Sequence, residues 1–450
     1  MGIGYVKWFS CLLIVCLFGF IYPLVLTNGF IDTKIIIFYI IIFYSLFRLC
    51  YIIIGGTLKL LEMTFFIFTY LFMGLAALVQ TYNNAFPWNG NYSDGHIIIA
   101  GLTVIIGMVC YDAGLLFANK NKSKMKPVEN VSNIRLGLVV FAGLISFLIG
   151  VIGLGGIQNL GSPTGLDQTS SLIYNKLMTA PIFVALIYSL LVWVNRKRKS
   201  ILIKSNFYLF CLIIMLITLN IIAANPMYTS RYWYGTVVIG TLFVFIKWRK
   251  LTLTTIIFAF LIGFLFVFPY ADAYRYGEFN IETKNLEATL LNGDYDAFQQ
   301  VMNSQKYTDM YGYSYGKQFL VSVLFWIPRS IWPDKPVGSG VTIGEGLGYN
   351  FTNISAPLWA EFNINFGMIG VILCFLLYGM ITAKLQNNFM KTRGDINFYQ
   401  IFVPVFSVYQ LFLMRGDLLS TVAYLVPVIV CILLGLRVKL FQKRFVLRKA

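Results

Sequence analysis

Basic and acidic side chains gather beside the predicted outer ends of apolar segments, and their types suit a phosphate-rich ligand. A guanidinium is always charged and binds phosphate oxygens in a bidentate fashion. Several such groups at one membrane depth would suit a lipid pyrophosphate, whereas a single arginine at a membrane face often only anchors a helix. The residues concerned are Arg231, Asp272, Arg275, Glu278, Arg329, Asp334, Lys335, Glu361, Arg415 and Asp417.

Metal chemistry has weak support in the sequence. Asp294 and Asp296 form an Asp-x-Asp motif, which holds a metal and a nucleotide sugar in some glycosyltransferases. Three residues match often by chance, and the motif falls on the predicted outer side, where nucleotide sugars are absent. His96 is the single histidine, and imidazole is the commonest ligand of zinc. We therefore predict no metal and no cofactor.

The elements that carry these residues are predicted to be membrane helices. The chain is 58% hydrophobic and only 12% charged, with a mean hydropathy of +0.75. Soluble domains have about 45–50% apolar and about 25% charged residues. A spanning helix needs about 20 apolar residues. Twelve such runs are predicted, at 8–27, 35–54, 61–80, 97–117, 136–156, 178–195, 201–223, 232–247, 251–270, 365–385, 396–414 and 418–436.

The positive charge of the chain predicts its orientation. Lysines and arginines cluster at 120–126, 196–199, 247–250, 391–393 and 437–449. With twelve spans, all five clusters lie on one side, which the positive-inside rule makes cytoplasmic. Both termini are then cytoplasmic. The net charge of +17 is accordingly a topology signal, and we predict no nucleic-acid binding.

One outer loop is far longer than an ordinary connection. It divides the chain into residues 1–270 with nine spans, the loop 271–364, and residues 365–450 with three spans and a basic cytoplasmic tail. Its apolar stretch 319–331 is too short to span a bilayer and contains Pro328, so an interfacial or re-entrant helix is predicted there.

Few charges fall within the predicted spans. Arg48 lies inside the second span, while Glu62, Asp112 and Lys204 lie near span ends, where long side chains can reach the interface. A proton-driven transporter usually has carboxylates near the bilayer midplane. This distribution argues for a site at the outer face of the membrane, and against a transport path through it.

Several short motifs resemble one family. They are Ile-Pro-Arg-Ser-Ile-Trp-Pro-Asp-Lys-Pro at 327–336, Ser-Ala-Pro-Leu-Trp-Ala-Glu-Phe at 355–362, Asn-Phe-Gly at 365–367 with Gly370, Ser230-Arg231, and Arg-Gly-Asp at 415–417. Together with about twelve spans and one large outer loop late in the chain, they resemble the bacterial oligosaccharide repeat-unit polymerases, the Wzy-type O-antigen and capsule polymerases. The resemblance implies an all-α polytopic membrane protein with a GT-C-like arrangement and a large periplasmic loop.

The family's activity supplies an expectation for the residues. It implies transfer of a growing glycan from undecaprenyl pyrophosphate onto the next lipid-linked repeat unit, at the periplasmic face of the inner membrane. For this chemistry we predict Glu361 as general base and Arg329 as a catalytic cation. Asp272, Asp417 and His96 are weaker candidates for the base. Predicted pyrophosphate- or sugar-binding residues are Arg231, Arg275, Lys335, Arg415, Asp417 and Trp332.

The expected partners follow from the same resemblance. They are the lipid-linked glycan, the lipid bilayer, a chain-length regulator and a flippase. Two alternatives remain open, namely a flippase for the lipid-linked unit and an O-antigen ligase, because both handle the same lipid pyrophosphate. The sequence leaves the identity of the sugars and of their linkage undetermined.

Overall fold

The computed structural model describes most of the chain as helix. The described residues are 2–29, 32–88, 90–120, 135–160, 168–198, 205–227, 229–246, 248, 250–267, 286–351, 354–393 and 396–436. Within these ranges every regular element is helical and none is a strand. The all-α prediction is confirmed for this part of the chain.

Nine helices of the described ranges are long and apolar enough to cross a membrane. They are Tyr5–Leu26, Thr33–Gly55, Leu60–Tyr82, Asp94–Ala118, Leu136–Gly153, Ile173–Arg196, Asn206–Ala223, Leu358–Lys391 and Leu418–Gly435. Each coincides with one of the predicted spans. The chain is therefore a polytopic membrane protein.

The other three predicted spans fall on helices that are shorter or carry more polar groups. The first consists of α10 (Arg231–Gly235), η4 (Thr236–Gly240) and α11 (Thr241–Phe245), and the second of α12 (Lys250–Ile262) and η5 (Gly263–Val267). The third is α19 (Phe398–Arg415), which contains Gln400, Gln410 and Arg415. Twelve spans therefore stay a prediction.

The nine long helices include several joined segments. The first three are α1 (Gly2–Ile14) with η1 (Val15–Ile21) and α2 (Tyr22–Leu26), then α3 (Thr33–Gly55), then α4 (Leu60–Phe68) with η2 (Thr69–Leu75) and α5 (Ala76–Tyr82). The next four are α6 (Asp94–Lys120), α7 (Leu136–Gly153), α8 (Gln168–Arg198) and α9 (Ser205–Ala223), with the short η3 (Ile157–Asn159) after α7. The last two are α18 (Leu358–Lys391) and α20 (Leu418–Gly435).

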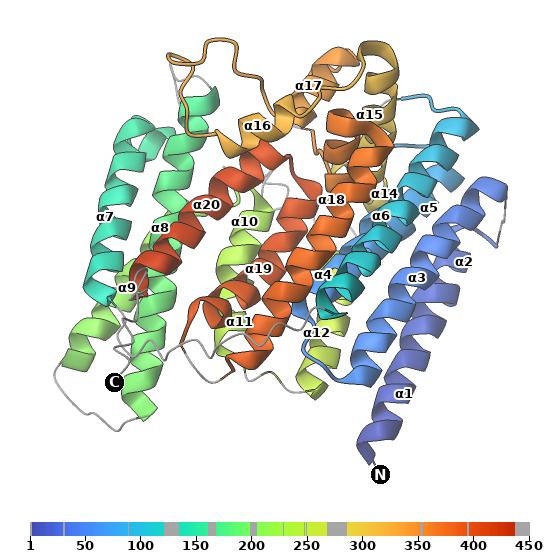
Figure 1. Cartoon of the computed structure of the whole chain (residues 1–450). Coiled ribbons are helices and arrows are strands. Elements are labelled where there is room, and N and C mark those ends of the chain that lie inside the picture. The colour runs from blue at the N-terminus through green and yellow to red at the C-terminus, as the bar shows by residue number, and fades with distance from the viewer. Residues whose placement is uncertain are drawn as a thin grey trace, which may run out of the picture. The chain divides into compact units, whose positions relative to one another are not determined.

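Short helices make up the described part of the predicted outer loop. They are α14 (Leu286–Leu290), η6 (Gly293–Tyr295), α15 (Ala297–Tyr311), α16 (Lys317–Val323) and α17 (Ser339–Gly346). Figure 1 shows α15, α16 and α17 together at one end of α6 and α18. The predicted interfacial segment 319–331 is helical only as far as Val323, and Pro328 lies in the turns that follow.

Two glycines determine how α18 packs against α6 and where it is interrupted. A Cβ at Gly379 would press on the carbonyl oxygen of Tyr111 and lie 3.1 Å from the Cα of Gly114, so α6 and α18 approach to backbone contact. Gly367 interrupts α18 with φ 63° and ψ −153°, a conformation that essentially only glycine adopts. The break separates a buried first segment from the long helix that follows.

The described residues form two compact units. The first consists of Met1–Met125, Pro226–Lys391 and Val403–Ala423, and the second of Lys126–Asn225, Thr392–Phe402 and Tyr424–Ala450. In the first unit residues 60–81 of the helix Leu60–Tyr82 are all buried, as the apolar residues on all its faces require. All the described candidate site residues belong to this first unit.

Candidate functional site

The turn between α19 and α20 organises the candidate site. Helix α19 ends at Arg415 and α20 begins at Leu418, so the Arg-Gly-Asp motif is a tight connection between two helices. Asp417 caps α20, because its Oδ1 accepts a hydrogen bond of 2.7 Å from the backbone N–H of Ser420. Gly338 lies against this cap, since a Cβ there would be 2.5 Å from Oδ2 of Asp417.

Glu361 of α18 contacts the same turn. Its side chain is fully buried, and its Oε1 accepts a hydrogen bond of 2.7 Å from the backbone N–H of Leu418. Its Oε2 accepts a second hydrogen bond, also 2.7 Å, from the hydroxyl of Ser339. No described Lys or Arg pairs with it, and its bond from the Leu418 N–H places it at the positive end of the α20 dipole. A buried carboxylate with so little compensation is typical of a functional site.

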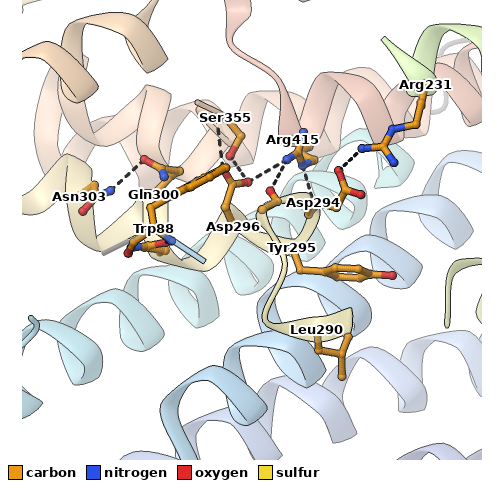
Figure 2. A network of polar contacts seen from close by, with 12 residues as sticks. Trp88, Arg231, Leu290, Asp294, Tyr295, Asp296, Gln300, Asn303, Ser355 and Arg415 are labelled. Carbon is orange, nitrogen blue, oxygen red and sulfur yellow. Dashed lines mark hydrogen bonds and ion pairs between the residues drawn. The ribbon is translucent and has the colours of Figure 1, made fainter. Parts of the chain in front are cut away.

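Two of the predicted phosphate-binding arginines are held by aspartates from the outer loop (Figure 2). Arg231 donates to Oδ1 of Asp294 at 2.5 Å, and Arg415 donates to Oδ1 of Asp296 at 3.0 Å. Arg415 also donates from Nε to the carbonyl of Asp294 and from Nη2 to the carbonyl of Gly293, at 2.9 and 2.8 Å. The structure thus brings both arginines to the single turn Gly293–Asp296.

Asp296 is the most connected residue of this network. Its side chain is 1% exposed. Oδ1 accepts a hydrogen bond of 2.7 Å from the Ser355 hydroxyl, and Oδ2 accepts one of 2.9 Å from the indole N–H of Trp88. Gln80, on the buried α5, donates to the carbonyls of Leu290 and Tyr295, both at 2.9 Å. Hydrogen bonds therefore join the turn to α5, through Gln80, and to α19, through Arg415.

The Arg415 guanidinium keeps one nitrogen available. Nε and Nη2 make the bonds described above, while Nη1 makes no hydrogen bond to any described residue. The guanidinium carbon also lies 5.5 Å from the centre of the Tyr232 ring. The side chain of Arg415 is 19% exposed.

The remaining predicted cations are used differently. Lys335 is buried and donates to the carbonyls of Phe325 and Ile327 at 2.7 and 2.8 Å, which closes the loop after α16. Arg329 reaches the carbonyl of Pro333 at 3.5 Å, and Trp332 is partly exposed on the same loop. No described hydrogen bond or ion pair joins Arg329 or Trp332 to Glu361 or to the two arginines.

No protein-family model, curated protein or solved structure matches this chain.

Three of the predicted ionisable residues lie outside the described residues, namely Asp272, Arg275 and Glu278. His96 is described and stands apart from the turn. Its Nδ1 lies 2.7 Å from the Ser93 hydroxyl and its Nε2 lies 4.0 Å from Asp309. Its described contacts therefore include none of the residues around Glu361.

Sequence reasoning missed the role of the Asp-x-Asp pair. It considered Asp294 and Asp296 as metal ligands, whereas in the structure each carboxylate faces an arginine. Ser339, which donates to Glu361, and Trp88 were missed as well. Only the order Asn-Gly-Asp-Tyr-Asp, which is typical of a turn, signals the pair locally.

A second polar cluster lies among α3, α4 and α6. Arg48 pairs with Glu62 at 3.0 Å and with Asp112 at 2.8 Å, and Lys59 pairs with Glu62 at 2.9 Å. Gln386 of α18 donates to Glu62 at 3.0 Å. Glu62 was expected near a span end, where a side chain can reach water, but it is 2% exposed and compensated by ion pairs.

Proposed function

We propose that this protein is a membrane glycosyltransferase that polymerises lipid-pyrophosphate-linked oligosaccharide units at the outer face of the bacterial inner membrane. One observation carries the proposal. The Arg415–Leu418 turn bonds to the buried carboxylate of Glu361 through the Leu418 N–H, and to the Asp294 carbonyl through Arg415. Asp294 in turn pairs with Arg231 through its carboxylate. A base and anion-binding groups that are linked through this turn and Asp294 suit a reaction that releases a pyrophosphate.

The chemistry follows from these groups. An acceptor hydroxyl attacks the anomeric carbon of the donor glycan and loses its proton to Glu361. The bond between that carbon and the phosphate oxygen breaks, and the lipid pyrophosphate leaves with the electron pair. Arg415 and Arg231 stabilise the negative charge on the leaving group. Ser339 now donates to Oε2 of Glu361, which is the position that the acceptor hydroxyl takes in the reaction.

The arginines have to serve both the aspartates and the substrate. The carboxylates of Asp294 and Asp296 balance Arg231 and Arg415 before the substrate binds. An Arg fork offers five N–H donors, so phosphate oxygens can bind at donors that the aspartates leave available, such as Nη1 of Arg415.

A strain that lacks only this gene tests the proposal. Its surface glycan is separated on a gel, with complementation by the wild-type gene as the control. Collapse of the ladder to a single repeat unit supports a polymerase, because export and ligation then still work. Complementation with Arg415→Lys or Arg231→Lys, with membrane insertion checked by immunoblot, tests the two arginines. An unaltered ladder in the deletion strain contradicts the proposal.

Transport of the same lipid-linked unit is the second candidate function. The observation in its favour is the cluster of Arg48, Glu62 and Asp112 among the membrane helices, because ionisable groups there often mark a substrate or ion path. A transporter or a ligase predicts loss of every repeat-bearing band in the deletion strain, including the single unit. The same gel therefore separates a polymerase from a transporter or a ligase.

A further inference from the structure

We propose that a pocket beside α17 binds a sugar of the acceptor glycan, an inference that rests on the proposed function. The pocket has a volume of about 420 Å³, within the roughly 300–1,000 Å³ of small-molecule sites. Five of its lining side chains carry polar groups, and they come from the outer segments α15, α16 and α17. They are Tyr307, Tyr311, Gln318, Thr342 and Glu345.

Two tyrosines form one wall of the pocket. Tyr307 and Tyr311 lie one turn apart on α15, with ring centres 4.9 Å apart, and Tyr311 is 58% exposed. The Tyr311 hydroxyl donates to the carbonyl of Gly346 at 3.0 Å. A Cβ at Gly346 would lie 2.5 Å from the Tyr307 ring, so glycine is needed for this packing. The wall offers apolar ring faces with hydroxyls at their edges, which suits the mixed surface of a sugar ring.

The other groups of the pocket favour hydroxyls over phosphate. Gln318 donates to the Thr342 hydroxyl at 3.0 Å, so an amide and a hydroxyl lie side by side. Glu345 is exposed and brings a carboxylate, which accepts hydrogen bonds from hydroxyl groups. No described lining residue is a lysine or an arginine. A lone negative charge repels a pyrophosphate and leaves a neutral polyhydroxyl ligand as the best match.

Helix α17 links the pocket to Glu361. Thr342 lines the pocket, and Ser339, three residues earlier and so adjacent on the helix surface, donates to Glu361. A sugar in the pocket is thus about one helical turn from the hydroxyl that occupies the acceptor position. We therefore assign the pocket to the acceptor glycan and the arginines to the donor pyrophosphate.

Saturation-transfer NMR on the full-length protein in nanodiscs tests the pocket. The probe is the repeat-unit oligosaccharide of the source bacterium, released from its lipid pyrophosphate. We expect a signal with the wild type. Glu345→Gln should weaken binding about tenfold, the loss expected for one hydrogen bond to a charged group. Tyr311→Ala removes one of the two rings of the wall and should weaken binding by a similar factor. Tyr315→Ala removes a tyrosine of the same segment that is 80% exposed and outside the pocket, so it keeps wild-type affinity.

The outcomes separate this assignment from the proposed function. Absence of a signal with the wild type overturns the assignment of the pocket, whatever the deletion strain shows. Wild-type affinity in both pocket variants overturns it as well. Glu345→Gln changes an exposed side chain, so an unchanged gel-filtration profile excludes unfolding as the cause of a loss. A pocket-dependent signal together with an unaltered glycan ladder keeps the saccharide site and rejects the polymerase.

Discussion

Buried charged side chains near the turn before α20 have two kinds of hydrogen-bond partner, neutral for Glu361 and charged for the arginines. Among the described residues, the buried Glu361 carboxylate accepts hydrogen bonds from two neutral groups, the Ser339 hydroxyl and the Leu418 N–H. Arg231 and Arg415, in contrast, each face a carboxylate. Because the partners of the arginines are charged and those of Glu361 are not, the two kinds of residue call for different tests.

Replacement of Glu361 by glutamine tests its role as a base. Glu361→Gln keeps the size of the side chain and an oxygen for the Leu418 N–H, so we expect the protein to fold and insert normally. Loss of the base should slow glycan transfer by roughly 10²–10⁴-fold. The measurement is the rate of chain growth with purified protein and lipid-linked repeat units. Ser339→Ala is the matched control, since it leaves the carboxylate intact, and we expect it to stay within about tenfold of the wild type. A wild-type rate for Glu361→Gln would remove this residue from the mechanism.

Asp296 is expected to act mainly through stability. Asp296→Ala removes the carboxylate that pairs with Arg415 and the acceptor of the Ser355 hydroxyl and the Trp88 indole. Loss of one member of a buried ion pair costs about 3–5 kcal/mol. Denaturant unfolding in detergent micelles measures this loss. Asp309→Ala, whose side chain is 73% exposed, is the control and should change the free energy of unfolding by less than about 0.5 kcal/mol. Equal effects of the two substitutions would contradict a structural role for the Asp296 pair.

At the scale of elements, the break in α18 determines where Glu361 lies. The segment before Gly367 carries Trp359, Glu361 and Asn363, all buried, beneath the outer helices. Asn365 reinforces the break, because its side chain donates to the Glu361 carbonyl at 2.8 Å and accepts from Ser314 at 3.0 Å. A continuous helix would turn the first segment away from these partners.

Gly367→Ala tests the break directly. Alanine at φ 63° and ψ −153° is strained by about 1–3 kcal/mol, and its Cβ would lie 2.9 Å from the Tyr313 ring. We expect a loss of unfolding free energy of at least that size, measured in the same detergent. Gly137→Ala in α7 is the control, because no atom lies within 4 Å of its Cβ and alanine stabilises a helix by about 0.5–1 kcal/mol. If Gly367→Ala proved as stable as this control, the break would not be required by glycine.

The whole molecule has an orientation that its basic clusters predict. Tyr315 is 80% exposed on the outer segment, and Lys391 is exposed at the end of α18. In a variant whose seven native cysteines are replaced, we expect Tyr315→Cys to react with a membrane-impermeant maleimide in intact spheroplasts. Lys391→Cys should react only after permeabilisation, because the positive-inside rule places it in the cytoplasm. The reverse pattern of labelling would invert the topology and remove the proposed site from the outer face.

The sequence by itself determined that this is a helical membrane protein and located nine of its long helices. The apolar composition and the length of each run are local properties, and bilayer thickness converts them directly into helices. The candidate role of Glu361 as base was also predicted from the sequence, through the motif at 355–362 and the chemistry that its resemblance implies. The hydrogen-bond partners of Glu361, Ser339 and Leu418, were not predicted from the sequence.

Only the tertiary structure decided which charges meet. Arg231 and Asp294 are 63 residues apart in the chain, Arg415 and Asp296 are 119 apart, and Glu361 and Leu418 are 57 apart. No local pattern connects residues so distant, because their pairing depends on how α18, α19 and the Gly293–Asp296 turn pack. The same packing directs Lys335 to carbonyl groups of its own loop and joins α15 to α17 at the pocket, since burial makes each polar group find whichever partner the fold brings near.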